Sequence, residues 1–255
     1  YTGDVRSVPA LHEAIEAAQP EIVFHLAAQP LERASYEDPR ATFETNVMGT
    51  VNLLEAVRSL PNVRAVVIIT TDKCYENREW SYGYRESDPL GGFDPYSSSK
   101  ACAELVSAAY RHSFFNPADH GMGHRVGVAT ARAGNVIGGG DWSEDRLIPD
   151  CVRAFSAGKT LVLRYPAAIR PRQHVLEPLS GYLWLAALLH ERGPGYADAW
   201  NFGPDDRSVM SVEDVVRKVA ALWGNGAYRL DDEGAPPVAG ALKLDISRAH
   251  RELDW

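Results

Sequence analysis

The chain has 255 residues, a formal net charge of −8 and a pI near 5.5, with 45% hydrophobic and 24% charged residues. This composition is typical of a globular protein, and the negative charge argues against a nucleic-acid surface. No apolar run reaches the roughly 20 residues that a membrane span needs. Three cysteines without the spacing of a zinc site indicate reduced thiols in a cytoplasmic protein that holds no metal.

Short apolar runs alternate with longer amphipathic segments along the first half of the chain. Strands are expected over residues 21–26, 64–70 and 126–132. Apolar residues recur at helical spacing over residues 39–60 and 94–114. This alternation predicts an α/β fold with a Rossmann-like, doubly wound parallel sheet.

The pattern changes after Gly134, where a glycine-rich loop, GNVIGGGDWSEDR, begins. Shorter elements are expected beyond it: strands over residues 161–164 and 174–176, and helices over residues 178–190 and 211–222. We therefore expect a second, smaller lobe, with its boundary near Ile137.

Tyr96 and Lys100 stand four residues apart in DPYSSSK, where Pro95 lies just inside a helix start. This spacing places both side chains on one face of the helix. An ammonium beside a phenol lowers the pKa of the phenol, and tyrosine can then act as a base near neutral pH. The alternative is an ordinary surface pair.

Thr71, Asp72 and Lys73 directly follow the second predicted strand. Ligands bind at the carboxyl ends of the strands in an open parallel sheet. A hydroxyl at that position, with Tyr96 and Lys100 on the next helix, resembles the catalytic triad of the short-chain dehydrogenase/reductase superfamily. The resemblance implies that Thr71, Tyr96 and Lys100 are catalytic.

Other segments resemble the extended branch of that superfamily. GDVR near Asp4 resembles the segment that meets the adenine, HLAA resembles the turn beneath the nicotinamide, and TNVMGT resembles an asparagine-bearing helix. The resemblance implies NAD as the cofactor, held by Asp4, Val5, Leu26, Ala27, Ala28, Asn46, Thr70, Tyr96 and Lys100.

The acid after Thr71 separates nucleotide-sugar 4,6-dehydratases from epimerases, which carry small residues there. With Lys73 following Asp72, and with GGFDPYSSSK, RAGNVIGGGDW and QHVLEPLSGY, the chain is similar to the CDP-glucose 4,6-dehydratase family. The resemblance implies conversion of CDP-glucose to CDP-4-keto-6-deoxyglucose for deoxysugars of a surface polysaccharide such as the lipopolysaccharide O-antigen. The rivals are a dTDP- or UDP-sugar dehydratase or epimerase, and a non-catalytic nucleotide-sugar binder.

In that reaction Tyr96 would take the proton of the sugar 4-hydroxyl during transient oxidation of C4. Asp72, kept protonated in a dry site, would donate to the departing C6 hydroxyl. Lys73 would act as the base at C5 or as an ammonium that holds Asp72 in its anionic form, and both roles stay open.

The resemblance also implies a set of substrate contacts, in which arginine forks suit a diphosphate: Gln29, Asn135, Arg146, Arg170 and Asn201. Arg172 stands where the family usually carries tryptophan, which leaves the nucleotide base preference open. Relatives pair two long helices into the four-helix bundle of a homodimer. Here Phe43, Val47 and Leu105 are the interface candidates, or else ordinary core residues.

By the same resemblance, residues 1–137 form a partial NAD-binding domain, and residues 138–255 form mainly a nucleotide-sugar-binding lobe interleaved with it. The GxGxxG turn that binds dinucleotide phosphates is not in the sequence. We therefore expect the sequence to be part of a longer polypeptide. Without the turn it should bind NAD poorly, and the strand over residues 22–26 should have an unpaired edge.

Overall fold

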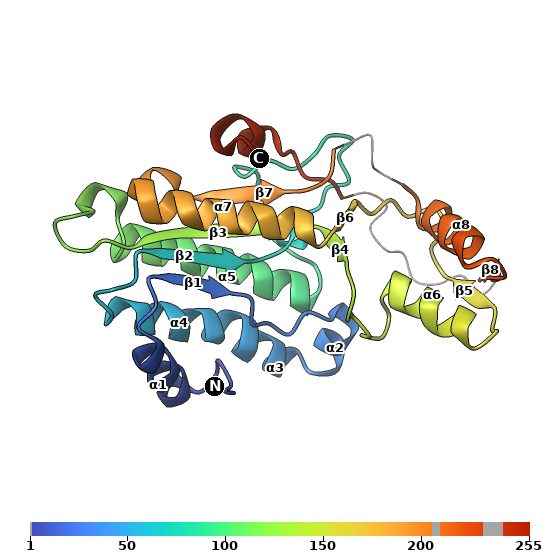
Figure 1. Cartoon of the computed structure of the whole chain (residues 1–255), viewed down its shortest axis with the longest axis horizontal. Helices are drawn as coiled ribbons and strands as arrows, with labels where there is room; N and C mark the ends of the chain where they lie inside the picture. The colour runs from blue at the N-terminus through green and yellow to red at the C-terminus, as the bar shows by residue number, and fades with distance from the viewer. Residues whose placement is uncertain (1, 206–209, 232–241) are drawn as a thin grey trace.

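Four parallel strands form the central sheet in the computed structural model, which describes residues 2–205, 210–231 and 242–255 (Figure 1). In sheet order they are Ile22–His25 (β1), Ala65–Ile69 (β2), Gly127–Ala133 (β3) and Ala199–Phe202 (β7). Helices cover both faces of this sheet, so the predicted α/β class is confirmed. As expected, β1 lies at an edge of the described sheet and pairs with β2.

Alternating residues of β2 divide the core into two layers. Ala65 and Val67 pack toward α7 (Leu176–Arg192), whereas Val66 and Ile68 pack toward α4 (Gly49–Arg58). Successive side chains of a strand point to opposite faces, and a strand buried on both faces is therefore apolar throughout. This explains the unbroken AVVII run, which ends where the polar Thr70 begins.

The predicted helix over residues 39–60 is confirmed as a continuous helical segment with a π-helical turn inside it. Its parts are α3 (Pro39–Phe43), η1 (Glu44–Met48) and α4. The π turn contains Asn46, and such turns often occur at functional sites. The helix predicted over residues 94–114 is α5 (Pro95–Ser113), which runs beside η1 and α4.

The second half of the chain contributes to two regions. One region has its own apolar core around Cys151 and Val216, and lies beside the main sheet in Figure 1. It consists of α6 (Leu147–Ser156), β5 (Leu161–Leu163), α8 (Val212–Trp223) and β8 (Tyr228–Leu230). The other, α7 with β7, returns to the main sheet. The division near Ile137 stays a prediction.

Several short elements were not predicted. They are α1 (Val8–Ala18), α2 (Glu32–Glu37), η2 (Asp72–Cys74), η3 (Pro117–Asp119), β4 (Asn135–Ile137), α6, η4 (Gly193–Tyr196), β7, β8 and η6 (Ala249–Leu253). The strand expected over residues 174–176 is wrong in position, because β6 spans Arg172–His174 and pairs with β4, while α7 already begins at Leu176. No described helix combines the length and the apolar character needed to cross a membrane.

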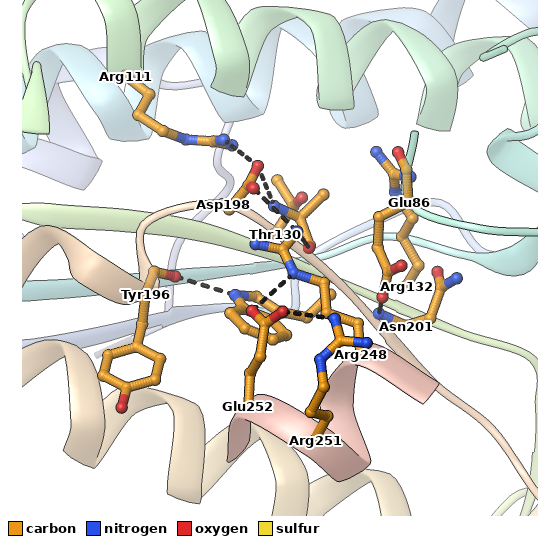
Figure 2. A network of polar contacts seen from close by, with 12 residues as sticks. Glu86, Arg111, Thr130, Arg132, Tyr196, Asp198, Asn201, Arg248, Arg251 and Glu252 are labelled. Carbon is orange, nitrogen blue, oxygen red and sulfur yellow. Dashed lines mark hydrogen bonds and ion pairs between the residues drawn. The ribbon is translucent and has the colours of Figure 1, made fainter. Parts of the chain in front are cut away.

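Ion pairs fix the C-terminal segment against the sheet. Asp198, just before β7, lies between Arg111 of α5 and Arg248, with N···O distances of 3.0 and 2.9 Å (Figure 2). The guanidinium of Arg248 also stacks over the Trp200 ring, 4.3 Å from its centroid. Asp198 therefore connects α5 and the segment before η6 at the amino end of β7.

Gly181 of α7 marks a close approach between this helix and the sheet. A Cβ atom there would lie 2.4 Å from Cδ1 of Phe202 in β7. We expect Gly181→Ala to lower the free energy of unfolding by about 2 kcal/mol, because the buried Phe202 ring must shift. Urea unfolding of the full-length protein measures the change.

Gly195→Ala is the matched control, since a Cβ there has no neighbour within 4 Å. It should leave the stability within about 0.5 kcal/mol of the parent. Equal stability of the two variants would contradict the packing described for Gly181.

Candidate active site

The sequence-predicted catalytic residues gather at the carboxyl end of the sheet. Thr71 follows β2 and caps the 3₁₀ turn η2, which contains Asp72 and Lys73, and α5 contacts this turn closely. The loop after β1 and the turn at Gly134 after β3 end at the same edge. Parallel strands therefore bring these segments together, as the position of ligand sites in such sheets requires.

The N-terminus of α5 sets the position of Tyr96. Asp94 caps the helix by accepting from Ser97 N at 2.9 Å, and Pro95 occupies the first turn. The backbone N–H of Tyr96 donates to Ser35 Oγ at 3.1 Å. These contacts fix the backbone at Tyr96.

The Thr71 hydroxyl lies close to the Tyr96 phenol. Burial raises the pKa of this phenol to about 12, although the nearby Thr71 acts to lower it. The nearby carboxyl group of Asp72 adds to the rise, and Arg146 opposes it. Tyr96 is therefore a phenol in this environment, and additional positive charge is needed for it to become a base.

Lys100 lies one helical turn beyond Tyr96 and is 7% exposed. Its Nζ donates to the backbone oxygen of Ile69, at 3.1 Å. Burial lowers the pKa of Lys100 to about 8, while the nearby Glu104 carboxylate acts to raise it. The sequence placed Tyr96 and Lys100 on one face, and the structure adds that Lys100 is anchored to the end of β2.

Asp72 is a carboxyl group removed from water, with 5% of the residue exposed. The Thr71 hydroxyl donates to Asp72 Oδ1 at 3.0 Å. On the other side Gly134 comes so close that a Cβ there would lie 3.1 Å from Oδ2. Burial raises the pKa of Asp72, against the smaller opposing effects of Lys73, Thr71 and Arg170. This environment favours a protonated carboxylic acid.

Lys73 points to a different partner. Its Nζ forms an ion pair with the Glu32 carboxylate of α2, and both side chains are partly exposed. This ion pair suits an electrostatic role for Lys73. A role as base at C5 requires the ion pair to break first.

Asn46 connects the loop after β1 to α5. Its Oδ1 accepts from the backbone N of Gln29 at 2.8 Å, and its Nδ2 donates to Ser99 Oγ at 2.8 Å. Ser99 Oγ in turn donates to the backbone oxygen of Tyr96 at 2.7 Å. Asn46 is 2% exposed, so it acts by holding these segments together.

The predicted arginines lie in loops beside Asp72 and Tyr96. Burial lowers the pKa of Arg170, and the Asp72 carboxyl acts in the opposite direction, which places the two groups within electrostatic reach. Arg170 NH1 donates to its neighbour, the Ile169 oxygen, and Arg172 NH1 donates to the Arg170 oxygen at 3.2 Å. Arg146 lies 3.6 Å from an oxygen of Asp141.

Asn201 differs from the other predicted contacts because it is buried, with no exposed surface. Its Oδ1 accepts from Tyr75 Oη at 2.7 Å, and its Nδ2 donates to the backbone oxygens of Tyr84 and Asp245. Figure 2 shows Asn201 beside Glu86 and Arg132. Both polar atoms of the amide serve the protein, so the geometry gives no support to substrate contact by this side chain.

Near the N-terminus, a hollow lies where the sequence predicted adenine contacts. It is lined by Gly3, Asp4, Val5, Ala10, Leu11 and Ala14. Hydrogen bonds from Arg6 lower the pKa of the Asp4 carboxyl to about 2, so this carboxylate is ionised at neutral pH. Leu26 and Ala27, also predicted for the cofactor, are exposed directly after β1.

Sequence reasoning missed the buried polar groups beneath the site, Glu104 and Arg132. Glu104 lies in the helix predicted over residues 94–114, and Arg132 ends the strand predicted over residues 126–132. In a sequence, an isolated charged residue in such an element cannot be told from a surface residue. The i,i+4 spacing of Glu104 after Lys100 was the signal that could have identified it.

Comparisons with known proteins identify the family to which this chain belongs. Residues 1–126 match the model of the GDP-mannose 4,6 dehydratase family. The chain is 55% identical over 256 residues to the CDP-glucose 4,6-dehydratase of Salmonella typhimurium, covering 100% of this chain and 71% of that protein.

Two solved structures extend the likeness to the fold. A dTDP-glucose 4,6-dehydratase from Streptomyces venezuelae with NAD bound is 25% identical, with a TM-score of 0.78 over 98% of this chain and 72% of that one. MoeE5 in complex with UDP-glucose and NAD is 25% identical, with a TM-score of 0.81 over 100% and 79%. The chain therefore belongs to the nucleotide-sugar 4,6-dehydratases of the extended short-chain dehydrogenase/reductase family, as its strand-end Thr-Asp-Lys sequence predicted.

Proposed function

We propose that the protein is a lyase that converts CDP-glucose to CDP-4-keto-6-deoxyglucose. The observation that carries this proposal is the buried Asp72 carboxyl, hydrogen-bonded to Thr71 and close to Tyr96. A sugar oxidised at C4 needs a proton donor for its leaving C6 hydroxyl, and a carboxyl group kept neutral by burial can supply one. The 55% identity to a CDP-glucose 4,6-dehydratase supports cytidine diphosphate as the nucleotide.

The residues present fit NAD as the cofactor. The hollow at Asp4 and Val5 has a largely apolar lining suited to a flat base, and the Lys100 ammonium has hydrogen-bond donors besides the one used on Ile69. When bound, NAD would supply the acceptor for the hydride of C4, which is returned at C6, and a positive charge that would favour the phenolate of Tyr96.

Tyr96 and Asp72 then have separate proton-transfer roles. Tyr96, close to the Thr71 hydroxyl, takes the proton from the sugar 4-hydroxyl. The resulting 4-keto group acidifies the C5 proton, which needs a base, and Asp72 protonates the departing C6 hydroxyl. Lys73 takes the C5 proton after it has left its ion pair with Glu32 and lost a proton, and while it is paired it is a positive charge near this exchange.

For the substrate, we assign the diphosphate to Arg146 and Arg170, and the sugar region to the exposed Asn135. The geometry gives no such support to Gln29, because its side-chain amide is bonded to Thr42 and to the backbone of Leu31. Arg172, bonded to the Arg170 backbone, is a candidate contact to the nucleotide.

We also infer the setting in which the enzyme works. Leu105 of α5 and Met48 of η1 are 58% and 49% exposed, which supports a homodimer through a four-helix bundle of these segments. Phe43 and Val47 are partly buried. The three free thiols support a cytoplasmic location, where the product would serve synthesis of surface polysaccharide such as O-antigen.

The direct test is incubation of the full-length protein with CDP-glucose and NAD, followed by mass analysis of the sugar nucleotide. We expect a product lighter by one water. A product of unchanged mass but altered configuration would instead identify an epimerase. If CDP-glucose stays unchanged while dTDP-glucose or UDP-glucose is dehydrated in a parallel incubation, the substrate carries a different nucleotide from the one proposed.

Asp72→Asn should reduce formation of the dehydrated product about 100-fold, because the amide cannot act as the acid. Burial raises the pKa of Asp72, so the parent rate should fall as the pH rises through that pKa and the acid loses its proton. Rates measured across pH should lack this decline in the variant.

Asp119→Asn is the control, since Asp119 is exposed near the other end of α5. It should retain the parental rate and pH profile. Undiminished dehydration by Asp72→Asn would rule out the acid role of Asp72.

A further inference from the structure

Glu104 is a buried carboxylate of α5, one helical turn beyond Lys100, and its side chain is 2% exposed. Three side chains donate to it: Thr70 Oγ1 at 2.5 Å, Thr130 Oγ1 at 2.7 Å and Arg132 NH2 at 2.8 Å. One of these donors is a guanidinium, which makes the contact charge-assisted. The structure therefore satisfies this carboxylate completely within the protein core.

These contacts attach α5 to the strand end that leads into the active site. Thr70 directly precedes the catalytic Thr71, and its neighbour Ile69 accepts the hydrogen bond from Lys100 Nζ at 3.1 Å. Helix α5 thus holds the end of β2 twice, through Lys100 and through Glu104. Loss of either contact would free the backbone that carries Thr71.

The charges around Lys100 give Glu104 a second effect. His25 of β1 is neutral, because burial and Lys100 lower its pKa to about 4, and burial raises the pKa of the Cys74 thiol in η2. Arg132 of β3 is a second buried cation. Among the described residues acting on Lys100, Glu104 is the acidic side chain that opposes its loss of a proton.

We propose that Glu104 is a positioning residue of the dehydratase reaction: its carboxylate keeps Lys100 in the ammonium form and holds the strand end that carries Thr71 and Asp72 against α5. Arg132 balances the carboxylate from the opposite side. The catalytic part of this inference rests on the proposed function, whereas the charge coupling between Glu104 and Lys100 does not.

The coupling can be measured without substrate. Each lysine of the full-length protein labelled with ¹³C-lysine gives its own NMR signal, and Lys100→Arg identifies the signal of Lys100. Glu104→Gln removes the anion and should lower the pKa of Lys100 by about one pH unit. Arg132→Gln removes the cation that pairs with Glu104, and the unbalanced carboxylate should then raise the pKa of Lys100.

Thr130→Val is the matched control, because it removes one donor from the carboxylate without changing any charge. It should lower stability and leave the titration of Lys100 unchanged. If Glu104→Gln does not fold, Arg132→Gln still changes a charge and Thr130→Val does not, so the comparison of these two variants tests the coupling. A Lys100 titration that is the same in the folded charge variants and the parent would overturn the proposal.

Catalysis provides the second readout. Beyond the decline that belongs to Asp72, kcat/KM for CDP-glucose should decline again as Lys100 loses its proton, and in Glu104→Gln this second decline should move to lower pH by the shift measured for Lys100. A shifted titration with an unmoved decline would show a merely structural role and overturn the positioning claim. Failure of the parent protein to dehydrate CDP-glucose would refute the proposed function alone, because the Lys100 titration does not depend on it.

Discussion

Asp72 loses its water when the end of β2, η2 and the turn at Gly134 pack together, and the rest of the site is arranged around this desolvated carboxyl. Burying a carboxylate is unfavourable without strong compensation, so the group tends to hold a proton. Thr71 offers a single hydroxyl donor, at 3.0 Å, and Lys73 pairs with Glu32. The compensation around Asp72 is therefore small enough to leave it an acid.

Glu104 provides the contrast, since it is equally buried but is surrounded by three donors that include a guanidinium. Two carboxyl groups close to the same strand end thus have opposite environments. One is suited to donating a proton and the other to holding a charge. Different environments for two acids are a general way for one fold to assign different proton-transfer roles.

Helix α5 combines these parts because its period places Tyr96, Lys100 and Glu104 on one face, at successive turns. The helix starts at a defined residue through the Asp94 cap, which fixes the height of each side chain above the sheet. A register set by local capping therefore determines which side chain meets the end of β2.

Much of this arrangement could be predicted from sequence. The apolar runs at β1, β2 and β3 and the helical spacing of α5 identified the main sheet, and the order of Thr71, Tyr96 and Lys100 identified the site. The short strand β7 could not be predicted, because AWNF lacks a clear period and is stabilised by pairing with β3. Asn201 was assigned to the substrate because the sequence cannot show that Tyr75 occupies its amide.

The protonation state of Asp72 is the central claim, and infrared spectroscopy tests it most directly. The difference spectrum between the parent protein and Asp72→Asn, recorded at neutral pH on the full-length protein, isolates the bands of this carboxyl group. A protonated Asp72 predicts the carbonyl band of a carboxylic acid, lost in the variant. A carboxylate band in its place would show that Asp72 is ionised, and would contradict its assignment as the acid.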